Sequence, residues 1–338
     1  MAPTRLLASL FLIVCLFTNV IPQTPADQDD VIRVDTDLTN LLFTAADKQN
    51  RFITTLKEED LRLTEDGVPQ KILTFQRETD RPLALAFLID VSVSEERTLP
   101  LEKAAARSFI ETVIQSSKDQ AAIVPFTGSA FLEQGLTRDV LSVYRALERV
   151  EVAMPSYLGS GRAISGIASG PGMMATPAEG TTAIWDAVAL TSSEVLGKSA
   201  GQRRRAIILL TDGQDTTSRL SRKEAISRAL EAETIIYAIG IGDEGINRDE
   251  LKAVAAATGG RAFFPKRETD LKTSFAEIEA ELRSQYLIAY SSANKKRDGA
   301  YRQMQIDVIN PGLAKDKLKL RYRPGYFAKP IGDKARSN

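Results

Sequence analysis

The chain has 338 residues, and Lys plus Arg equal Asp plus Glu at 44 each, so the formal net charge is zero. This balance lacks the basic excess of a nucleic-acid-binding protein, and we expect no nucleic-acid partner. The sequence contains no histidine, and its one cysteine is Cys15. A Ser-His-Asp triad, a Cys-His pair and a His/Cys zinc site are therefore excluded, and any metal must have oxygen ligands, which favours Mg²⁺, Mn²⁺ or Ca²⁺.

The N-terminus has the composition of an export signal. Arg5 precedes a mostly apolar run from Leu6 to Val20, and prolines and acidic residues follow. The run is short for a helix that spans a membrane. We predict a signal peptide over residues 1–26 and an exported protein, periplasmic or extracellular. The alternative is an uncleaved segment that anchors the chain in a membrane.

Residues 27–80 are predicted to form an N-terminal β segment. Glu65-Asp66-Gly67 is a hairpin-turn signal between two of its strands. Alternation of apolar and polar residues predicts short strands at 31–37, 40–45, 60–64 and 70–75.

Residues 81–283 change to continuous apolar strands that alternate with helical patterns, which predicts an α/β domain with a doubly wound, mostly parallel sheet. Strands are expected at 83–90, 121–126, 206–211, 234–241 and 260–264, with an antiparallel edge strand at 131–136. Helices are expected at 99–114, 140–150, 183–196, 221–231, 248–256 and 271–283.

A long loop interrupts this alternation at 153–180. It is rich in glycine, serine and proline and ends where the third helix begins. Structureless stretches of this length inside a domain are often functional, so we predict that the loop lies beside the metal and tunes the choice of partner.

Residues 284–328 return to β patterns, with strands expected at 285–291, 301–309 and 318–327, followed by a tail over 329–338. Neither flank of the α/β domain has enough strands for a core of its own. We therefore predict that 27–80 and 284–328 pack together as a second, small all-β domain. The alternative is two separate β appendages.

Three motifs carry the chemistry. The first predicted strand ends in Asp-x-Ser-x-Ser, formed by Asp90, Ser92 and Ser94, and the third ends in Thr-Asp-Gly around Asp212. Thr182 lies where the long loop enters a helix. Each motif alone is explained by helix capping. Together they place carboxylates and hydroxyls at the carboxyl edge of a sheet, where ligands of open α/β sheets bind.

The set resembles the metal-ion-dependent adhesion site of von Willebrand factor type A (VWA) domains, and the resemblance covers about residues 83–282. The flanks resemble a secreted bacterial family, the VWFA-related acidobacterial domain, through DLRLTEDG at 60–67 and RPGYF at 323–327. Val93 and Thr181 stand where that adhesion site commonly has glycine. Because a β-branched residue disfavours a positive φ, the loop at Val93 is expected to use ordinary backbone angles.

The resemblance implies a role for each residue. Ser92 and Ser94 would bind the ion through their hydroxyls, and Thr182 would supply the third hydroxyl. Asp90 and Asp212 would hold waters bound to the ion. One coordination position stays open. An ion that keeps most of its positive charge attracts an external carboxylate, and Mg²⁺ suits this arrangement because it retains several waters.

We therefore expect a binding module without catalytic residues, which captures an Asp or Glu carboxylate on a protein or peptide partner. One alternative is a structural or assembly protein of the cell envelope with a non-functional metal site. Another is a metal-assisted hydrolase, for which Glu95 and Glu96 are the nearby candidates for a general base.

Overall fold

The structure is a computed structural model that describes residues 38–78, 81–152, 162–163, 181–199, 203–242 and 245–329. The predicted signal segment and all but two residues of the predicted loop at 153–180 lie outside these ranges. Among the described helices, none has the length and apolar character needed to cross a membrane.

A six-stranded sheet forms the centre of the α/β domain, in the order β12-β11-β10-β5-β6-β8. Neighbouring strands are parallel except β8, which runs antiparallel to β6 at one edge. Every residue of β5 is buried, as expected of a continuous apolar strand covered on both faces. The strands are β5 (Leu83–Asp90), β6 (Gln120–Phe126), β8 (Gln134–Thr137), β10 (Arg204–Thr211), β11 (Thr234–Gly240) and β12 (Ala262–Phe263).

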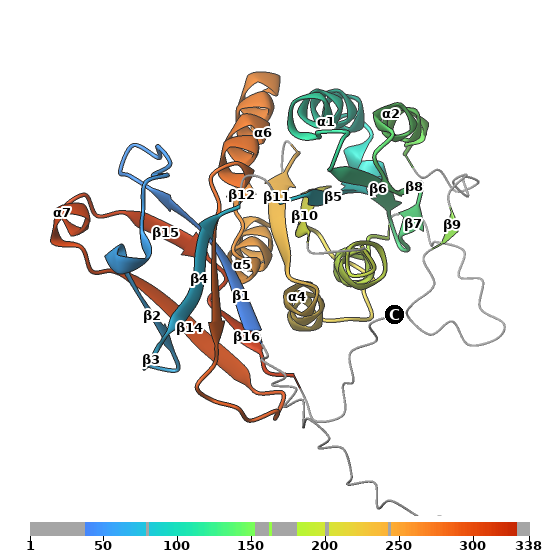
Figure 1. Cartoon of the computed structure of the whole chain (residues 1–338). Coiled ribbons are helices and arrows are strands. Elements are labelled where there is room, and N and C mark those ends of the chain that lie inside the picture. Colours follow the sequence, from blue (N-terminus) through green and yellow to red (C-terminus); the bar gives the residue numbers. More distant parts are fainter. Residues whose placement is uncertain are drawn as a thin grey trace, which may run out of the picture. The chain divides into compact units, whose positions relative to one another are not determined.

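Helices cover both faces of this sheet (Figure 1). On one face lie α1 (Leu99–Val113), α2 (Val140–Arg149) and α6 (Glu268–Leu282). On the other lie α3 (Ile184–Leu190), the π-helical η3 (Thr191–Leu196), α4 (Arg222–Glu231) and α5 (Arg248–Thr258). A short pair, β7 (Phe131–Leu132) and β9 (Arg162–Ala163), forms a separate two-stranded sheet.

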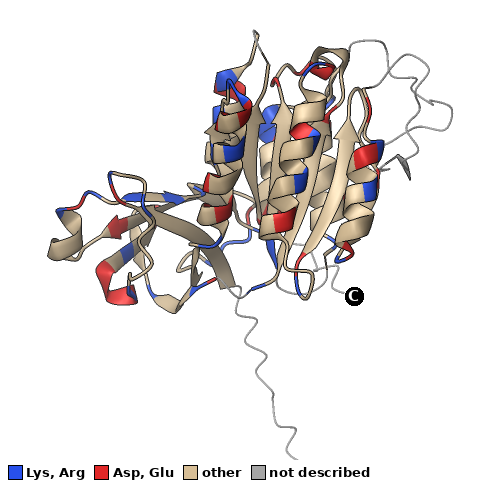
Figure 2. Cartoon of the chain, turned by 90° about the horizontal axis from the view of Figure 1, so that it is seen from above, with Lys and Arg blue, Asp and Glu red and all other residues tan. Residues whose placement is uncertain are grey.

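Local sequence signals explain where the helices begin. Asp139, Ser221 and Asn247 cap α2, α4 and α5 by accepting backbone N–H groups in the first turn. Figure 2 shows basic and acidic residues interspersed along the helices, whereas the strands between them carry few charges.

The flanks form two antiparallel four-stranded sheets, in the orders β15-β1-β13-β4 and β16-β14-β2-β3. In the first, β1 from the N-terminal flank pairs with β13 from the C-terminal flank, and in the second β2 pairs with β14. The two sheets enclose a common apolar core that includes Leu41, Leu63, Tyr286 and Ile306. The predicted fold class, an α/β domain with an all-β region built from both flanks, is therefore confirmed.

The elements of this β region are β1 (Leu38–Ala46), η1 (Glu58–Asp60), β2 (Leu61–Glu65), β3 (Val68–Gln70), β4 (Ile72–Arg77), β13 (Tyr286–Ser291), β14 (Tyr301–Val308), α7 (Pro311–Ala314), β15 (Lys319–Tyr322) and β16 (Gly325–Phe327). The predicted hairpin joins β2 to β3, with φ of 49° at Asp66 and 78° at Gly67.

Four predicted elements differ from the structure. The strand expected at 70–75 divides at Lys71 into the end of β3 and most of β4, which lie in different sheets. The strand expected at 318–327 divides into β15 and β16, which lie in different sheets, because Pro324 lacks the N–H that a continuous ladder needs. The helix expected at 183–196 becomes π-helical from Thr191. The edge strand expected at 131–136 is broken at Glu133 into β7 and β8.

Candidate metal site

Asp90 is the last residue of β5, and its side chain is fully buried. One carboxylate oxygen accepts the N–H of Ser92 at 3.0 Å, and the other accepts the hydroxyl of Thr211 at 2.6 Å. Thr211 ends β10, the neighbouring strand, so this bond ties two strand ends together. Burial raises the pKa of Asp90 to about 6, although the hydrogen bonds oppose the shift. A nearby cation would favour the ionised form of this carboxyl group.

Ser92 and Ser94 lie at the 3-10 turn η2 (Val93–Glu95), with their Oγ atoms 2.9 Å apart. Ser92 is buried, whereas Ser94 is exposed and Val93 is 48% exposed. Val93 is absent from the described residues with positive φ, so the loop uses ordinary backbone angles, as predicted. The two hydroxyls therefore lie side by side at the boundary between the sheet edge and solvent.

Asp212 follows β10 directly and is half-buried. Its backbone N–H donates to Oε1 of Glu95 at 3.1 Å, and its Oδ1 accepts the N–H of Gln214 at 2.9 Å. Gly213 has a φ of 81°, which provides the sharp exit that the Thr-Asp-Gly motif predicts. A Cβ at Gly213 would lie 2.9 Å from Cγ of Leu251, so the turn also needs glycine for space.

Thr182 is buried beside the loop that carries Asp212. Its N–H donates to Oγ1 of Thr216 at 2.8 Å, and its carbonyl accepts the N–H groups of Thr216 and Thr217 at 2.8 and 3.1 Å. These bonds attach the backbone of Thr182 to the segment that follows Asp212. The place of its hydroxyl among the metal ligands stays a prediction.

Two acidic residues close to the motifs, Asp215 and Asp186, hold the surrounding backbone in place. Asp215 Oδ1 accepts the N–H of Ile184 at 2.8 Å at the start of α3. Asp186 accepts the N–H of Arg219 at 3.1 Å and that of Leu220 at 2.8 Å. Trp185 is 6% exposed and belongs to the core. These contacts attach the loop after Asp212 to α3.

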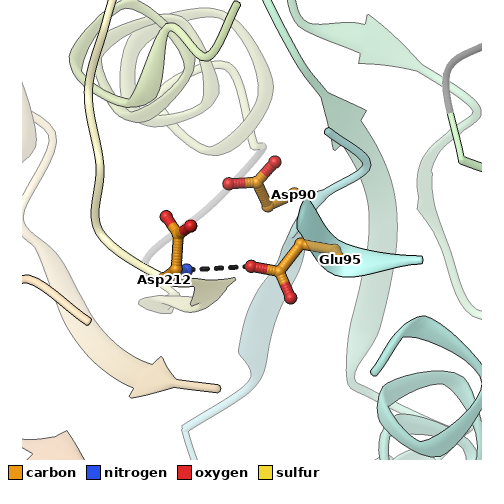
Figure 3. A group of neighbouring side chains, drawn as sticks. All are labelled: Asp90, Glu95 and Asp212. Carbon is orange, nitrogen blue, oxygen red and sulfur yellow. Dashed lines mark hydrogen bonds between the residues drawn. The ribbon is translucent and has the colours of Figure 1, made fainter. Parts of the chain in front are cut away.

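The structure brings three carboxylates together at the sheet edge (Figure 3). We call Asp90, Glu95 and Asp212 the acid cluster; one oxygen from each lies within 4.8 Å of the other two. Glu95 was not among the predicted ligands. Its only sequence signal is its position directly after Ser94, because the 3-10 turn there directs the side chain back toward the strand end.

Glu95 is 1% exposed, and its Oε2 accepts the hydroxyl of Thr98 at 2.6 Å. Its pKa is raised to about 7, first by burial and then by the negative charges of Asp90 and Asp212, while the Thr98 hydroxyl opposes the shift. Both oxygens of Glu95 thus have protein donors, one from Thr98 and one from the Asp212 backbone.

Glu102 on α1 adds a fourth acid behind Glu95. It is 0% exposed, and neither carboxyl oxygen has a hydrogen-bond partner. Burial raises the pKa of Glu102 well above its ordinary value, and the charge of Glu95 raises it further. An ionised carboxyl at this buried position would be costly, so the protonated form of Glu102 is favoured.

The donor set fits a hard cation. Carboxylate and hydroxyl oxygens are the ligands that Mg²⁺ and Ca²⁺ prefer. Within the described part of the chain, neither the acid cluster nor Glu102 forms an ion pair with a basic side chain. No basic side chain among the described residues therefore offsets these acids, and in the absence of a cation burial raises the pKa values of Asp90, Glu95 and Glu102 instead.

A family model of the von Willebrand factor type A domain matches residues 84–277. No curated protein shows a significant match to the sequence. Among solved structures, the chain is similar to proximal thread matrix protein 1 from the mussel byssus with a zinc-occupied MIDAS motif, at 20% identity and a TM-score of 0.49, covering 66% of this chain and 50% of that one. It is also similar to a von Willebrand factor type A protein from Catenulispora acidiphila, at 14% identity and a TM-score of 0.45, covering 88% and 75%.

A third similar structure is BatB from Bacteroides thetaiotaomicron, a conserved hypothetical protein, at 17% identity and a TM-score of 0.44, covering 60% of this chain and 100% of that one. The chain spans about half the length of the mussel protein.

Proposed function

Because the chain belongs to the von Willebrand factor type A domain family, we propose that its sheet edge holds a divalent cation and uses it to bind a carboxylate of a protein or peptide partner. The observation that carries this proposal is the meeting of Asp90 and Asp212 at the carboxyl ends of adjacent strands, next to the paired hydroxyls of Ser92 and Ser94.

Each residue has a part in this function. Ser92, Ser94 and Thr182 supply hydroxyl ligands. Asp90 and Asp212 hold metal-bound waters and keep the ion in place. The cation, when bound, supplies positive charge to an incoming carboxylate. Ser94 and Val93 are exposed, so this edge is open to a partner.

The same geometry favours binding over catalysis. Glu95, with a pKa raised to about 7, has the proton affinity of a general base. However, its side chain is only 1% exposed and both of its oxygens accept protein hydrogen bonds, so a substrate does not reach it. We therefore propose a non-enzymatic role. The second candidate is a purely structural role, in which the metal site has no function. Partner binding that depends on a divalent metal would distinguish the binding module from this structural protein.

We also propose that the protein is exported, to the periplasm or outside the cell. This rests on the signal-like composition of residues 1–26. An exported location would give the module access to envelope or extracellular partners.

The test uses immobilised peptides that carry a single Asp or Glu, with Asn and Gln versions as controls. Wild-type protein should bind the acidic peptides in excess Mg²⁺ or Ca²⁺ and release them when a chelator is added. Asp90→Asn should lose this binding. The matched control is Asp249→Asn, which removes a carboxylate whose side chain is 98% exposed on α5. Equal binding to acidic and amide peptides, or binding that survives the chelator, would refute the proposal.

A further inference from the structure

Val93 lies between the two serines that are proposed to bind the ion, and its side chain is 48% exposed. The turn is anchored without it, because Val91 and Leu99 on either side are each 4% exposed and belong to an apolar core. Val93 belongs to none of the three apolar cores that the described residues form. Its apolar surface therefore faces solvent beside the proposed metal site.

Covalent geometry places Val93 next to any peptide that binds the ion. Consecutive Cα atoms are about 3.8 Å apart, so the Cα of Val93 is that close to those of Ser92 and Ser94. The Oγ atoms of the two serines are themselves only 2.9 Å apart. Three residues of an extended peptide span about 10 Å. A peptide with its acid over these hydroxyls thus covers a surface that includes Val93.

The position of Val93 distinguishes it from the other exposed apolar side chains, since single exposed apolar residues are common on protein surfaces. The others among the described residues lie in the β region or at the start of α2, and they are Leu38, Val68, Leu73, Leu141, Tyr301 and Ile309. Among the large apolar side chains exposed in the described part of the chain, only Val93 lies at the carboxyl edge of the central sheet.

The exposed residues around Val93 are polar or charged. On the same turn these are Ser94, Glu96 and Arg97, and after β10 they include Gln214. An aliphatic group of a partner gains free energy where it displaces water from apolar surface, whereas covering a polar side chain without a hydrogen bond costs free energy. The edge therefore offers a partner one local apolar contact rather than a broad apolar face.

The type of side chain suits such a contact. Valine is β-branched and stiff at χ1, so it loses little conformational freedom when a partner covers it. Many adhesion sites of the kind that the sequence resembles have glycine at this position. The valine thus adds a contact that binding of the ion does not require.

We propose that Val93 is a specificity-determining residue, which contacts an aliphatic side chain next to the Asp or Glu that binds the ion. The partner is then a peptide segment in which the acid is flanked by Leu, Ile or Val, rather than an acid within a polar or uniformly acidic segment. This inference rests on the proposed function, because the bound carboxylate brings the segment to Val93.

The test is isothermal titration of three synthetic peptides into the full chain in excess Mg²⁺. In the first peptide a single Asp has Leu on both sides, in the second the same Asp has Ser on both sides, and in the third Asn replaces Asp between the two Leu residues. The variant is Val93→Thr, which keeps the β-branched shape and exchanges a methyl group for a hydroxyl. The matched control is Val68→Thr, the same change at a side chain that is 52% exposed in β3.

Wild type should bind the Leu-flanked Asp peptide about fivefold more tightly than the Ser-flanked one, because contact with Val93 removes apolar surface from water. Val93→Thr should reduce this preference to less than about twofold and leave binding of the Ser-flanked peptide unchanged. The heat capacity of binding should be more negative for the Leu-flanked peptide in wild type, and this difference should shrink in Val93→Thr. Val68→Thr should match wild type in both measurements.

Equal affinity of wild type for the two Asp peptides would overturn the inference and leave the proposed function in place. A preference that persists in Val93→Thr would also overturn it, because the apolar contact would then lie elsewhere. Absence of binding to both Asp peptides, or equal binding of the Asn peptide, would instead refute carboxylate capture and this inference with it. Val93→Ala, with the same expected loss of preference, replaces Val93→Thr if thermal melting shows that the latter is not folded.

Discussion

The metal-free protein should be more stable in mild acid than at neutral pH. The reason lies in Asp90 and Glu95, whose carboxyl groups are buried beside other acids. In the folded protein the pKa of Asp90 is raised from 3.8 to about 6, and that of Glu95 from 4.5 to about 7. Folding therefore favours the protonated form of both groups. The stability that they contribute is present below about pH 4 and is lost as pH rises through about 6 and 7.

The size of the effect follows from the change in pKa. For Asp90, a difference of about 2 pKa units corresponds to about 3 kcal/mol in total at about 1.4 kcal/mol per unit. About half of this loss, about 1.4 kcal/mol, falls between pH 5 and pH 8, because the unfolded pKa of 3.8 places the rest below pH 5. Glu95 acts in the same direction. No histidine titrates in this window, because the chain has none. The pKa of Glu102 is also raised, so this residue contributes in the same direction.

The assay is urea unfolding at pH 5, 6, 7 and 8 with a chelator present, followed by tryptophan fluorescence from Trp185. The unfolding free energy should fall by about 3 kcal/mol or more across the series. Asp90→Asn should reduce the slope, because it removes one of the two groups. Excess divalent metal should flatten or reverse the slope, because metal binds the deprotonated acids. A flat or rising profile with chelator, or an identical slope in Asp90→Asn, would refute this account of the acid cluster.

Two further changes test how the site is built. Glu102→Leu replaces a buried carboxyl without partners and should raise the unfolding free energy of the metal-free protein by about 1–3 kcal/mol at pH 7, measured by urea unfolding; a loss of stability would mean that Glu102 has a stabilising partner. Gly213→Ala should lower stability by about 1–3 kcal/mol and weaken metal binding, because φ is 81° and the new Cβ would lie 2.9 Å from Leu251. Wild-type melting and metal titration in Gly213→Ala would show that the turn adapts.

The sequence predicts where β5 and β10, the two strands that carry the acids of the site, come to an end. The predicted first strand, 83–90, coincides with β5, because seven apolar residues run without a polar break to Asp90. The Thr-Asp-Gly motif likewise marks the end of β10 and the positive φ at Gly213. These features depend on local chemistry, so local patterns are sufficient to locate them.

Other features depend on contacts between distant residues. The predicted strand at 318–327 divides because its two halves pair with different partners, β1 and β14, and the apolar pattern alone does not record that change of sheet. The inward direction of Glu95 depends on a turn whose geometry is completed by the N–H of Asp212, a residue far along the chain. Glu95 and Glu96 are adjacent acids, and no local pattern in the sequence shows that Glu95 is buried whereas Glu96 is exposed. The tertiary fold around the turn determines this difference.

The most direct test of the central claim is a crystal structure of the protein grown with Mn²⁺, with anomalous data collected for that ion. The account predicts an anomalous peak at the carboxyl edge of the sheet, with the hydroxyls of Ser92, Ser94 and Thr182 and the carboxylates of Asp90 and Asp212 surrounding it. No peak at this edge, or a peak that the three hydroxyls do not contact and that Asp90 and Asp212 do not reach through bound waters, would contradict the assignment of the metal site.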